Sequence, residues 1–416
     1  MTLIETQALA TRHAARRLAV SGQAEKNCAL NAIAAALVSR QEEWLAANRE
    51  DLEAAKASGM RPSLLDRLAL DENRIAGIAE GVRQVASLPD PVGQVVNTTL
   101  RPNGLKLERR RVPLGVVGII YEARPNVTVD AAVLCLKSGN AVLLRGGKEA
   151  FRSNKAVISI LRDALESVGL PRDCVALVED VSRESANEMM NLTGYLDVLI
   201  PRGGAGLIRS VAAHARVPVI RTGEGVCHIY VHQDADLDMA ARILYNAKCS
   251  RPSVCNAAEC VLIDRAVAED FLPMAWDYLK KKDVTLHGDP EAREILGDFV
   301  LPATAEDWDS EYGDYQLAVK IVSGFDEAVD FIAAHSTGHS EAIITENYTI
   351  AQQFLDTIDA AAVYVNASTR FTDGFEFGLG AEIGISTQKL HARGPMGLEE
   401  LTSTKYVIYG SGQVRE

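Results

Sequence analysis

The sequence predicts an α/β fold with two Rossmann-like domains, each built on a parallel sheet, and a small additional β element. Short β-branched runs alternate with amphipathic segments of helical length from Val112 to about Val231, and the alternation resumes after Cys255. Such alternation is typical of a parallel sheet with helices on both faces. Two extended runs, Thr98 to Arg111 and Thr402 to Tyr409, predict the β element. A chain of 416 residues is also long for a single hydrophobic core.

The first part of the chain, from Met1 to about Ser87, is rich in Ala, Leu, Glu and Arg at helical spacing. Breaks at Ser21-Gly22 and at Ser58 to Pro62 divide it into several amphipathic helices. The run from Pro89 to Gly93 ends this helical region. We therefore expect a layer of helices before the first strand.

The predicted strands are short and rich in Val, Ile and Leu. Those of the first domain are Gly115 to Ile120, Ala141 to Leu144, Cys174 to Val178, Val198 to Ile200 and Val217 to Ile220. Those of the second are Val261 to Ile263, Leu317 to Val322, Glu341 to Thr345 and Ala362 to Val365, with a helix over Asp326 to His335. The domains are expected to join near Asn246 to Arg251. Because ligands of doubly wound sheets bind at the carboxyl ends of the strands, we expect the chemistry in a cleft between the domains.

The predicted β element has two parts. The turn Pro102-Asn103-Gly104 separates two extended runs, which is a hairpin signal. The segment Thr402 to Tyr409 has no obvious local partner, and it could pair with the hairpin of another subunit. The basic run Arg109 to Arg111 could bind phosphate, but a solvated strand face or a subunit contact is the simpler interpretation.

Charge and composition exclude several classes of protein. A net charge of −13 disfavours nucleic acid and anionic membranes as partners. No apolar run reaches the roughly 18 residues of a membrane helix, and the first residues do not resemble a secretion signal, so we expect a cytoplasmic protein. The seven cysteines follow no disulfide framework. Cys249, Cys255 and Cys260 lack the spacing of a zinc site, and we expect no metal.

Cys255 follows a Pro-initiated turn at the predicted junction of the domains, within the run Lys248 to Asn256. A thiolate at such a cleft suits acyl transfer, because it attacks activated carbonyls and leaves a thioester that can accept hydride. An intracellular cysteine is more often a small buried apolar residue. The residues alone leave both interpretations open.

Two strand-to-helix turns contain glycines that could bind a nucleotide. Arg202, Gly203 and Gly204 follow one predicted strand, and exposed amides at the start of a helix can hold a pyrophosphate. The spacing differs from the G-x-G-x-x-G pattern, so a simple tight turn is an alternative. In the second turn, Arg145, Gly146 and Lys148 add two cations. These cations could bind a ribose 2′-phosphate and so favour NADP, or they could simply face solvent.

Asn126 follows the most apolar predicted strand and precedes a helix, in the run Tyr121 to Asn126. Its side-chain amide could donate to a developing oxyanion. It could equally cap the helix, which is the more common role of an Asn at that position.

Four stretches resemble the γ-glutamyl phosphate reductases, a branch of the aldehyde dehydrogenase superfamily. They are Val116 to Asn126 (VVGIIYEARPN), Arg251 to Asn256 (RPSVCN), His335 to Ile343 (HSTGHSEAI) and Gly374 to Ile383 (GFEFGLGAEI). The resemblance extends over nearly the whole chain, and the third stretch resembles the signature of this branch. It implies an aldehyde dehydrogenase-like fold.

The resemblance also implies roles for individual residues. Cys255 is the implied nucleophile, and Asn126 with the Cys255 backbone amide is the implied oxyanion hole. Glu311 matches the position where the superfamily has a Glu that binds the nicotinamide ribose. The implied domains are an NADP-binding domain (1–97 and 112–250), a catalytic domain (251–395) and an oligomerisation element (98–111 and 396–416).

One departure from the superfamily pattern is informative. Oxidising members have a Glu that activates the deacylating water, and in our alignment Arg221 takes that place. Loss of this base suits a reductase, because the thioester must survive until hydride transfer. Glu224 could replace the base if the loop shifts by a few residues.

The substrate of this family has an α-amino group, an α-carboxylate and a phosphate, which need cations and acceptors. The candidates are Arg124, Arg251, His335, His339, Ser340 and Glu341. For His339, a turn residue whose hydrogen bonds are made locally is an equally good interpretation. Arg370 ranks below them, because an Arg that closes a loop by binding carbonyl groups would look the same.

The implied reaction is the NADPH-dependent reduction of L-glutamyl 5-phosphate to L-glutamate 5-semialdehyde and phosphate, in proline biosynthesis. One alternative is a general aldehyde dehydrogenase that works in the oxidising direction. Another is an inactive binding or scaffold protein, which the presence of both Cys255 and Asn126 disfavours. We further expect a homo-oligomer and a possible association with glutamate 5-kinase.

Overall fold

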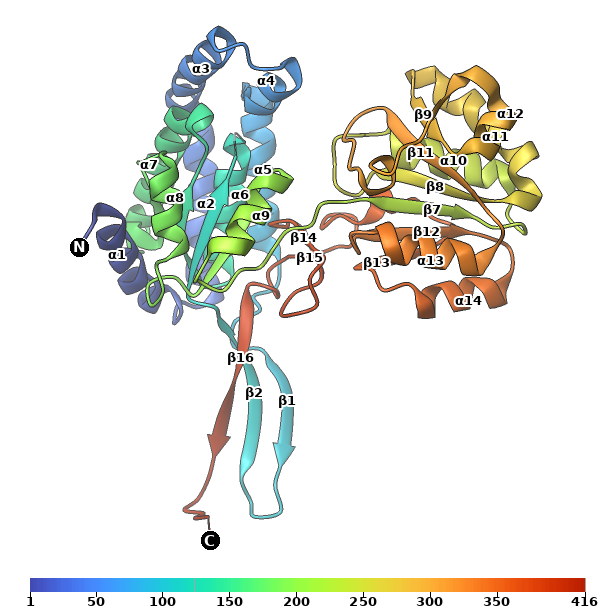
Figure 1. Cartoon of the computed structure of the whole chain (residues 1–416). Coiled ribbons are helices and arrows are strands. Elements are labelled where there is room, and N and C mark those ends of the chain that lie inside the picture. Colours follow the sequence, from blue (N-terminus) through green and yellow to red (C-terminus); the bar gives the residue numbers. More distant parts are fainter. Residues whose placement is uncertain (123, 416) are drawn as a thin grey trace. The chain divides into compact units, whose positions relative to one another are not determined.

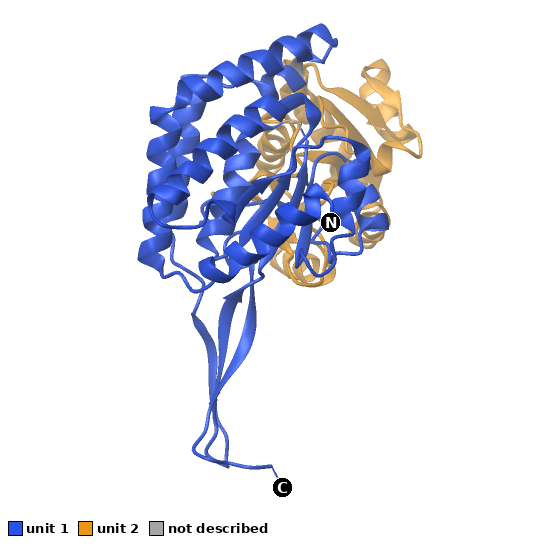
Figure 2. Cartoon of the chain, turned by 90° about the vertical axis from the view of Figure 1, so that its left-hand side faces the viewer, with its two compact units in different colours: residues 1–222, 378–384, 396–416 blue, residues 223–377, 385–395 orange. Residues whose placement is uncertain are grey.

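The computed structural model describes residues 1–122 and 124–415, with the side chains of Pro62, Ser63 and Ala205 left aside. The chain forms two compact units, shown in different colours in Figure 2. Unit 1 contains residues 1–222, 378–384 and 396–416, and unit 2 contains residues 223–377 and 385–395. Each unit is therefore assembled from segments that lie far apart in the sequence.

Unit 1 is built on a four-stranded parallel sheet in the order β5-β4-β3-β6. Its strands are β3 (Val116–Tyr121), β4 (Ala141–Arg145), β5 (Val175–Leu177) and β6 (Val198–Arg202). The core side chains of α1, α8 and α9 pack together on this sheet. A second group, α6 (Pro125–Lys137) with α2 and α5, forms a further helical layer (Figure 1). The sheet has the parallel arrangement that the sequence predicts.

The N-terminal helices begin and end close to the predicted breaks. Their bounds are α1 (Leu3–Leu18), α2 (Gln23–Ser39), α3 (Gln41–Ala57), α4 (Pro62–Leu68) and α5 (Glu72–Ser87). The Thr2 side chain accepts from the Glu5 amide, and the Glu5 side chain accepts from the Thr2 amide, which forms a capping box. The break at Arg40 between α2 and α3 has no Gly or Pro, so no break was predicted there.

The other helical elements of unit 1 follow its strands β4, β5 and β6. They are η1 (Lys148–Ala150), α7 (Phe151–Ser167), η2 (Arg172–Cys174), α8 (Arg183–Met190) and α9 (Ala205–His214). The predicted strand Val217 to Ile220 is wrong, because it makes only an isolated bridge between Val219 and Leu199. Pro218 supplies a carbonyl there but has no N–H to donate, which prevents a regular ladder.

Unit 2 is built on a seven-stranded parallel sheet in the order β10-β9-β11-β8-β7-β12-β13. Its strands are β7 (Cys227–Val231), β8 (Ala258–Asp264), β9 (Thr285–Gly288), β10 (Val300–Pro302), β11 (Gln316–Val322), β12 (Ser340–Ile344) and β13 (Ala362–Val365). One apolar cluster joins α10, α11 and α12 to the sheet, and a second joins α13 and α14 to it (Figure 1). Helices therefore cover both faces of the sheet, as the sequence predicts.

The helices of unit 2 are α10 (Leu237–Cys249), α11 (Arg265–Leu279), η3 (Lys280–Lys282), α12 (Pro290–Leu296), η4 (Gly297–Phe299), η5 (Asp307–Asp309), α13 (Phe325–His335), α14 (Tyr348–Thr357) and η6 (Thr369–Phe371). Two short strands, β14 (Ile385–Ser386) and β15 (Gly394–Pro395), pair antiparallel. The sequence-based boundary near residue 250 lies inside unit 2, because β7 and α10 belong to the second sheet and its core.

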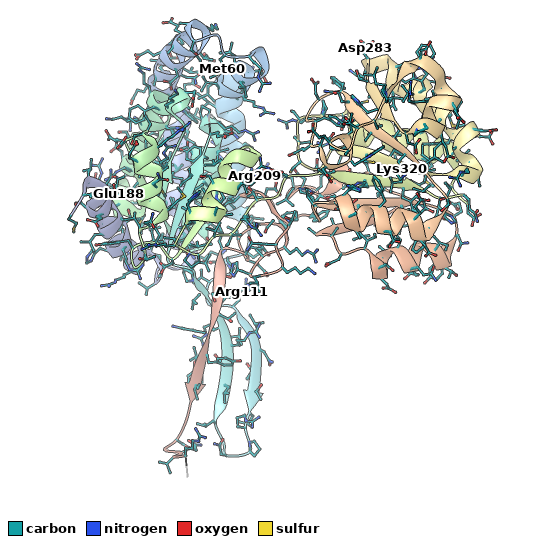
Figure 3. The ribbon with its side chains drawn as sticks, viewed as in Figure 1. Met60, Arg111, Glu188, Arg209, Asp283 and Lys320 are labelled. Carbon is teal, nitrogen blue, oxygen red and sulfur yellow. The ribbon has the colours of Figure 1, made fainter. Side chains whose placement is uncertain are left out.

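The β element is a three-stranded antiparallel sheet of β1 (Val95–Leu100), β2 (Lys106–Pro113) and β16 (Thr402–Tyr409). The predicted hairpin is present as β1 and β2. The three strands of the sheet extend from the rest of unit 1 as an arm (Figure 2). The terminal strand pairs with β2 of its own chain rather than with the hairpin of another subunit. Arg111 lies at the base of the arm (Figure 3), where it binds Glu399 at 2.5 Å.

Among the described residues, no helix combines the length and apolar character that would let it cross a membrane.

Candidate active site

Cys255 lies in the turn between α10 and β8, where its side chain is half-buried. Gly225 packs directly against this turn, since a Cβ atom at Gly225 would lie 1.4 Å from the Cys255 carbonyl oxygen. Only glycine fits at that position. The thiol of Cys227, the first residue of β7, donates to the same carbonyl at 3.2 Å. The Cys255 backbone is thus fixed by β7 and by the segment that precedes it.

Asn256 and Arg370 hold the residues on either side of Cys255. The buried Asn256 amide donates to the Thr372 carbonyl at 2.9 Å. Arg370 donates to the Asn256 side-chain oxygen and, at 3.1 Å, to the Ser250 hydroxyl. Burial lowers the Arg370 pKa, and the nearby charge of Arg251 lowers it further. Arg370 therefore serves the loop around Cys255, which is the structural role that the sequence analysis left open.

A chain of buried polar groups starts beside Cys227. The His339 Nδ1 atom lies 3.8 Å from the Cys227 sulfur and 2.8 Å from the Ser340 hydroxyl. The Ser340 hydroxyl lies 2.7 Å from the Thr372 hydroxyl, which lies 2.7 Å from the Tyr364 hydroxyl. Burial lowers the His339 pKa to about 4 and raises the Cys227 pKa well above its ordinary value. Both groups are therefore neutral near neutral pH.

Two other predicted substrate residues bind elsewhere in unit 2. Glu341 is fully buried on β12 and accepts from the His228 amide at 2.8 Å and from the Ser336 hydroxyl at 2.5 Å. His335, at the end of α13, lies 2.8 Å from Asp309. These contacts give Glu341 and His335 local partners, whereas Ser340 and His339 join the chain that reaches the Cys255 turn.

Glu311 lies in the loop between η5 and β11. Its carboxylate accepts from the Gly225 amide, and the same glycine packs on the Cys255 carbonyl. Desolvation of the carboxyl group raises the Glu311 pKa, and the nearby charge of Glu224 raises it further. Glu311 therefore lies within unit 2 near the nucleophile turn, although the two residues are far apart in sequence.

A buried ion pair flanks the same turn. The Lys248 ammonium, at the end of α10, lies 2.6 Å from the Glu259 carboxylate on β8, and both side chains are shielded from solvent. Burial raises the Glu259 pKa to about 7, whereas Lys248 acts to lower it. The sequence analysis did not single out either residue. The carboxylate within the apolar run Ala257 to Ile263 was the available signal, because a charge in such a strand needs a partner.

In unit 1, Asn126 lies in the first turn of α6, where its side-chain amide donates to Asp130 at 3.2 Å. Burial raises the Asp130 pKa to about 6. The backbone of Arg124 is the N-cap of this helix, and no side-chain hydrogen bond caps it. Asn126 is therefore inside the helix rather than at its cap. Ala123, in the same motif, lies outside the described residues.

Arg145 and Lys148 follow β4 but differ in their surroundings. The Arg145 guanidinium donates to the carbonyl groups of Val181 and Ser182, both at 2.7 Å, and burial lowers its pKa. Lys148 is exposed at the start of η1, just after the buried Gly146. Of the two predicted phosphate cations, Lys148 is thus the more accessible, and Arg145 holds the neighbouring loop.

The second glycine turn lies between β6 and α9. The Gly204 amide donates to the Glu122 carboxylate at 3.1 Å. A Cβ atom at Gly203 would lie 2.6 Å from the exposed Glu122 side chain, which would have to move aside. Arg202 is the last residue of β6 and is half-buried. The turn binds a carboxylate in this structure, which shows that its amides can hold an anionic oxygen.

The structure groups the predicted site residues within each unit. In unit 2, the contacts described above connect Cys255, Glu311, His339, Ser340 and Arg370. In unit 1, one glycine turn follows β4 and the other follows β6. Both strands pair parallel with β3, so the two turns lie at the carboxyl edge of one sheet. Sequence reasoning missed Cys227, Thr372 and Glu122, because their partners come from distant segments. It also missed Lys248 and Glu259, which are only 11 positions apart.

Comparisons with known proteins agree with this arrangement. A sequence model described as the aldehyde dehydrogenase family matches residues 7–296. The γ-glutamyl phosphate reductase of Ligilactobacillus salivarius is 60% identical over 407 residues, which are 98% of each chain. That of Halothermothrix orenii is 58% identical over 410 residues, 99% of this chain and 98% of its own. The crystal structure of γ-glutamyl phosphate reductase from Thermotoga maritima is 50% identical, with a TM-score of 0.97 and 99% of both chains covered. These matches confirm the resemblance and the fold predicted from the sequence.

Proposed function

We infer the function of the chain from the premise that it belongs to the aldehyde dehydrogenase family. It reduces L-glutamyl 5-phosphate to L-glutamate 5-semialdehyde and phosphate, the reductive step of proline biosynthesis that its relatives carry out. The observation that carries this conclusion is identity of 50–60% over nearly the whole length of the reductases compared above. The enzyme uses a nicotinamide cofactor.

We propose that Cys255 is the nucleophile. Its thiolate forms a bond to the acyl carbon, and the bond between that carbon and the phosphate oxygen breaks. The acyl group is then held as a thioester. The fixed backbone of the Cys255 turn supports this role, because a reacting sulfur must be held within bonding distance of its substrate.

Asn126 and the Cys255 amide are the proposed donors to the tetrahedral oxyanion. The helix around Asn126 supports this assignment, since the amide projects from the first turn of α6 and is not used as a cap. Each such donor contributes about 10²- to 10³-fold to kcat in acyl-transfer enzymes. Hydride addition converts the thioester into the anion of a thiohemiacetal. Its carbon–sulfur bond then breaks as the C=O bond re-forms, which releases the aldehyde and regenerates the thiolate.

The residues of unit 1 fit a bound dinucleotide. The Gly204 amide already donates to a carboxylate oxygen of Glu122, and a pyrophosphate offers anionic oxygens of the same kind. We propose that Arg202, Gly203, Gly204 and Gly146 surround the pyrophosphate, that Lys148 and Arg145 favour NADPH over NADH, and that Glu311 binds the nicotinamide ribose. When bound, the reduced nicotinamide supplies the hydride for the thioester carbon.

Reduction rather than oxidation is supported by the segment Arg221 to Gly225. Arg221 takes the place of the Glu that activates water in oxidising relatives. Glu224, the other candidate base, contributes its charge to the environment of Glu311. A thioester without an adjacent base to activate water survives until hydride transfer.

Recognition of the substrate is proposed to use the exposed cations Arg124 and Arg251 for the carboxylate and phosphate. His339 and Ser340 connect through Cys227 to the Cys255 carbonyl, so we assign them to the shape of the site. Arg370, His335 and Glu341 act through their local partners.

The arm of unit 1 is proposed to join subunits in a homo-oligomer. Its edge strands expose apolar side chains, with Leu100 74% exposed, Tyr406 65% and Ile408 57%. Exposed apolar edges of this kind are typical of assembly surfaces. We also place the enzyme in the cytoplasm, since Cys135, Cys174 and Cys260 are buried thiols that suit a reducing compartment.

The function is tested with glutamate 5-semialdehyde, NADP and phosphate. We expect NADPH formation that depends on phosphate, and we expect Cys255→Ala to abolish it. Cys28→Ala serves as the control, because Cys28 is an exposed cysteine of unit 1 and should leave the rate unchanged. NADPH formation without phosphate would favour the oxidising alternative, and full activity of Cys255→Ala would exclude the thioester.

A further inference from the structure

The pair of Lys248 and Glu259 is unusual for its burial. The two side chains are 0% and 1% exposed, and they lie on either side of Cys255 in the sequence, at the end of α10 and the start of β8. Removing two charges from water costs more than their mutual attraction returns unless further hydrogen bonds use the remaining atoms. The other contacts of the pair therefore indicate what it does.

The second carboxylate oxygen of Glu259 reaches the loop that carries Glu311. It accepts from the Gly313 amide at 3.3 Å. The Lys248 ammonium lies 5.9 Å from the centre of the Tyr312 ring, within the range of a cation–π contact. The pair thus contacts the two residues that directly follow Glu311.

The same loop is anchored at its other end by neutral and charged groups of unit 2. The Tyr312 hydroxyl donates to Asp307 at 2.8 Å, and the His287 ring stacks on the Tyr312 ring with 5.4 Å between centroids. Asp307 also accepts from the Thr304 amide at 2.6 Å. With residues on both sides fixed, Glu311 has little freedom to leave the Gly225 amide.

Gly225 connects this loop to the nucleophile turn. Its amide donates to Glu311, and its Cα packs on the Cys255 carbonyl. The Lys248 charge also acts on Glu311 and opposes the effect of Glu224. The ion pair, the Glu311 loop and the Cys255 turn therefore form one connected arrangement within unit 2.

We propose that Lys248 and Glu259 are positioning residues that hold Glu311 beside the Cys255 turn, in the orientation in which it binds the ribose next to the reactive ring of the cofactor. Neither residue is assigned a contact with substrate or cofactor. The inference rests on the proposed roles of Cys255 and Glu311. It predicts that loss of the pair weakens cofactor binding more than it changes the reactivity of the cysteine.

The test compares two double variants that both remove the buried charges. Lys248→Met with Glu259→Leu deletes the acceptor for the Gly313 amide, whereas Lys248→Met with Glu259→Gln keeps an oxygen there. Replacing both partners avoids a lone buried charge, which would unfold the protein. NADPH binding is measured by calorimetry, and Cys255 reactivity by its rate of alkylation without cofactor.

We expect the Leu variant to bind NADPH about tenfold more weakly, as for the loss of one charge-assisted hydrogen bond. The Gln variant should recover most of that loss. Both variants should alkylate at a rate within about twofold of the parent's, a smaller change than the loss of one charge-assisted hydrogen bond would cause. Adding Glu311→Gln to the Leu variant should cause little further loss, because both changes remove the same contact.

A matched control is the buried pair of Lys26 and Asp90 in unit 1, at 2.5 Å, in which Asp90 also accepts from a backbone amide, that of Val92. Lys26→Met with Asp90→Leu should leave NADPH affinity unchanged. The inference is overturned if the Leu and Gln variants bind NADPH alike, or if the control pair has the same effect. An inactive parent, or an active Cys255→Ala, would instead refute the proposed function.

Discussion

His339 shows how one side chain can make the stability of this protein depend on pH. The residue is fully buried between Cys227 and Ser340, and burial lowers its pKa to about 4. In the unfolded chain its pKa is about 6.5. Between these two pKa values, His339 is therefore protonated in the unfolded state and neutral in the folded state. Stability contributed by the neutral imidazole is present above about pH 6.5 and is lost as the pH falls toward 4.

We expect His339→Asn to reduce this acid sensitivity. The parent should lose about 3 kcal/mol of unfolding free energy between pH 6.5 and pH 4 through His339 alone. The variant should lose less over the same window, although it is less stable at pH 8. Urea unfolding at several pH values measures the difference, and His13→Asn, at an exposed position, is the control. Parallel pH profiles for parent and variant would contradict the assignment.

At the level of residues, the sequence identified single site residues better than the residues that they contact. Cys255, Asn126 and Glu311 were recognised from motifs, and the structure places Cys255 and Glu311 around one glycine. The contact between Cys227 and His339 was not predictable, because 112 positions separate them and Cys227 stands in none of the recognised stretches. Pairing of this kind is set by which strands become neighbours in the sheet.

Among the elements, the turn after β4 separates two cations that looked equivalent in sequence. Arg145 donates to two carbonyl groups of the next loop, whereas Lys148 is exposed at the start of η1. A guanidinium engaged by two carbonyls is less available to a ligand than an exposed ammonium. Discrimination between NADPH and NADH is therefore expected to depend more on Lys148.

We expect Lys148→Ala to raise the KM for NADPH about tenfold, the cost of one contact between a cation and a phosphate. The KM for NADH should stay unchanged, since NADH lacks the 2′-phosphate. Steady-state kinetics with each cofactor measures the ratio. Lys155→Ala is the control, because Lys155 pairs with Glu179 on the same part of unit 1. An equal rise for both cofactors would show that Lys148 does not read the 2′-phosphate.

The strands that sequence patterns predicted best are those with long apolar runs. β11 and β13 were predicted to within one residue, since each is a run of mainly β-branched and apolar residues that ends before a polar position, Ser323 and Asn366 respectively. β9 (Thr285–Gly288) and β10 (Val300–Pro302) were not predicted. Both are short. β9 alternates half-buried and buried positions, and β10, at the edge of the sheet, has one buried position followed by two exposed ones. A pattern this short that ends in Gly288 or Pro302 is not distinguished from a loop.

The arm is the element whose proposed role is easiest to test. Tyr406 and Ile408 lie on the same face of β16, since side chains of a strand alternate between faces, and both are exposed. We expect Tyr406→Lys with Ile408→Lys to dissociate the oligomer in analytical ultracentrifugation while the fold of each chain is retained. Ser403→Lys, on the opposite face of the same strand, should leave the assembly intact. A parent that sediments as a monomer would refute the proposed role of the arm.

At the scale of the whole molecule, unit 2 is nearly continuous in sequence, whereas unit 1 depends on segments from both ends. Residues 223–377 and 385–395 contain the seven-stranded sheet and the helices on both of its faces. Unit 1 needs residues 396–416, because β16 supplies eight paired positions to β2. The sequence predicted two domains but placed their boundary near residue 250, since β7 and α10 continue the alternating pattern of the first domain without interruption.

This difference predicts that residues 223–395 fold as an isolated fragment. The fragment keeps both apolar clusters of unit 2 and the contacts around the Cys255 turn. We expect a cooperative thermal transition and alkylation of Cys255 at a rate near that of the full chain, with a Cys255→Ala fragment as the control. It should not bind NADPH measurably, because the glycine turns after β4 and β6 belong to unit 1. A fragment that binds NADPH like the full chain would place the cofactor on unit 2 alone. A fragment without cooperative unfolding would show that unit 2 is not an independent folding unit.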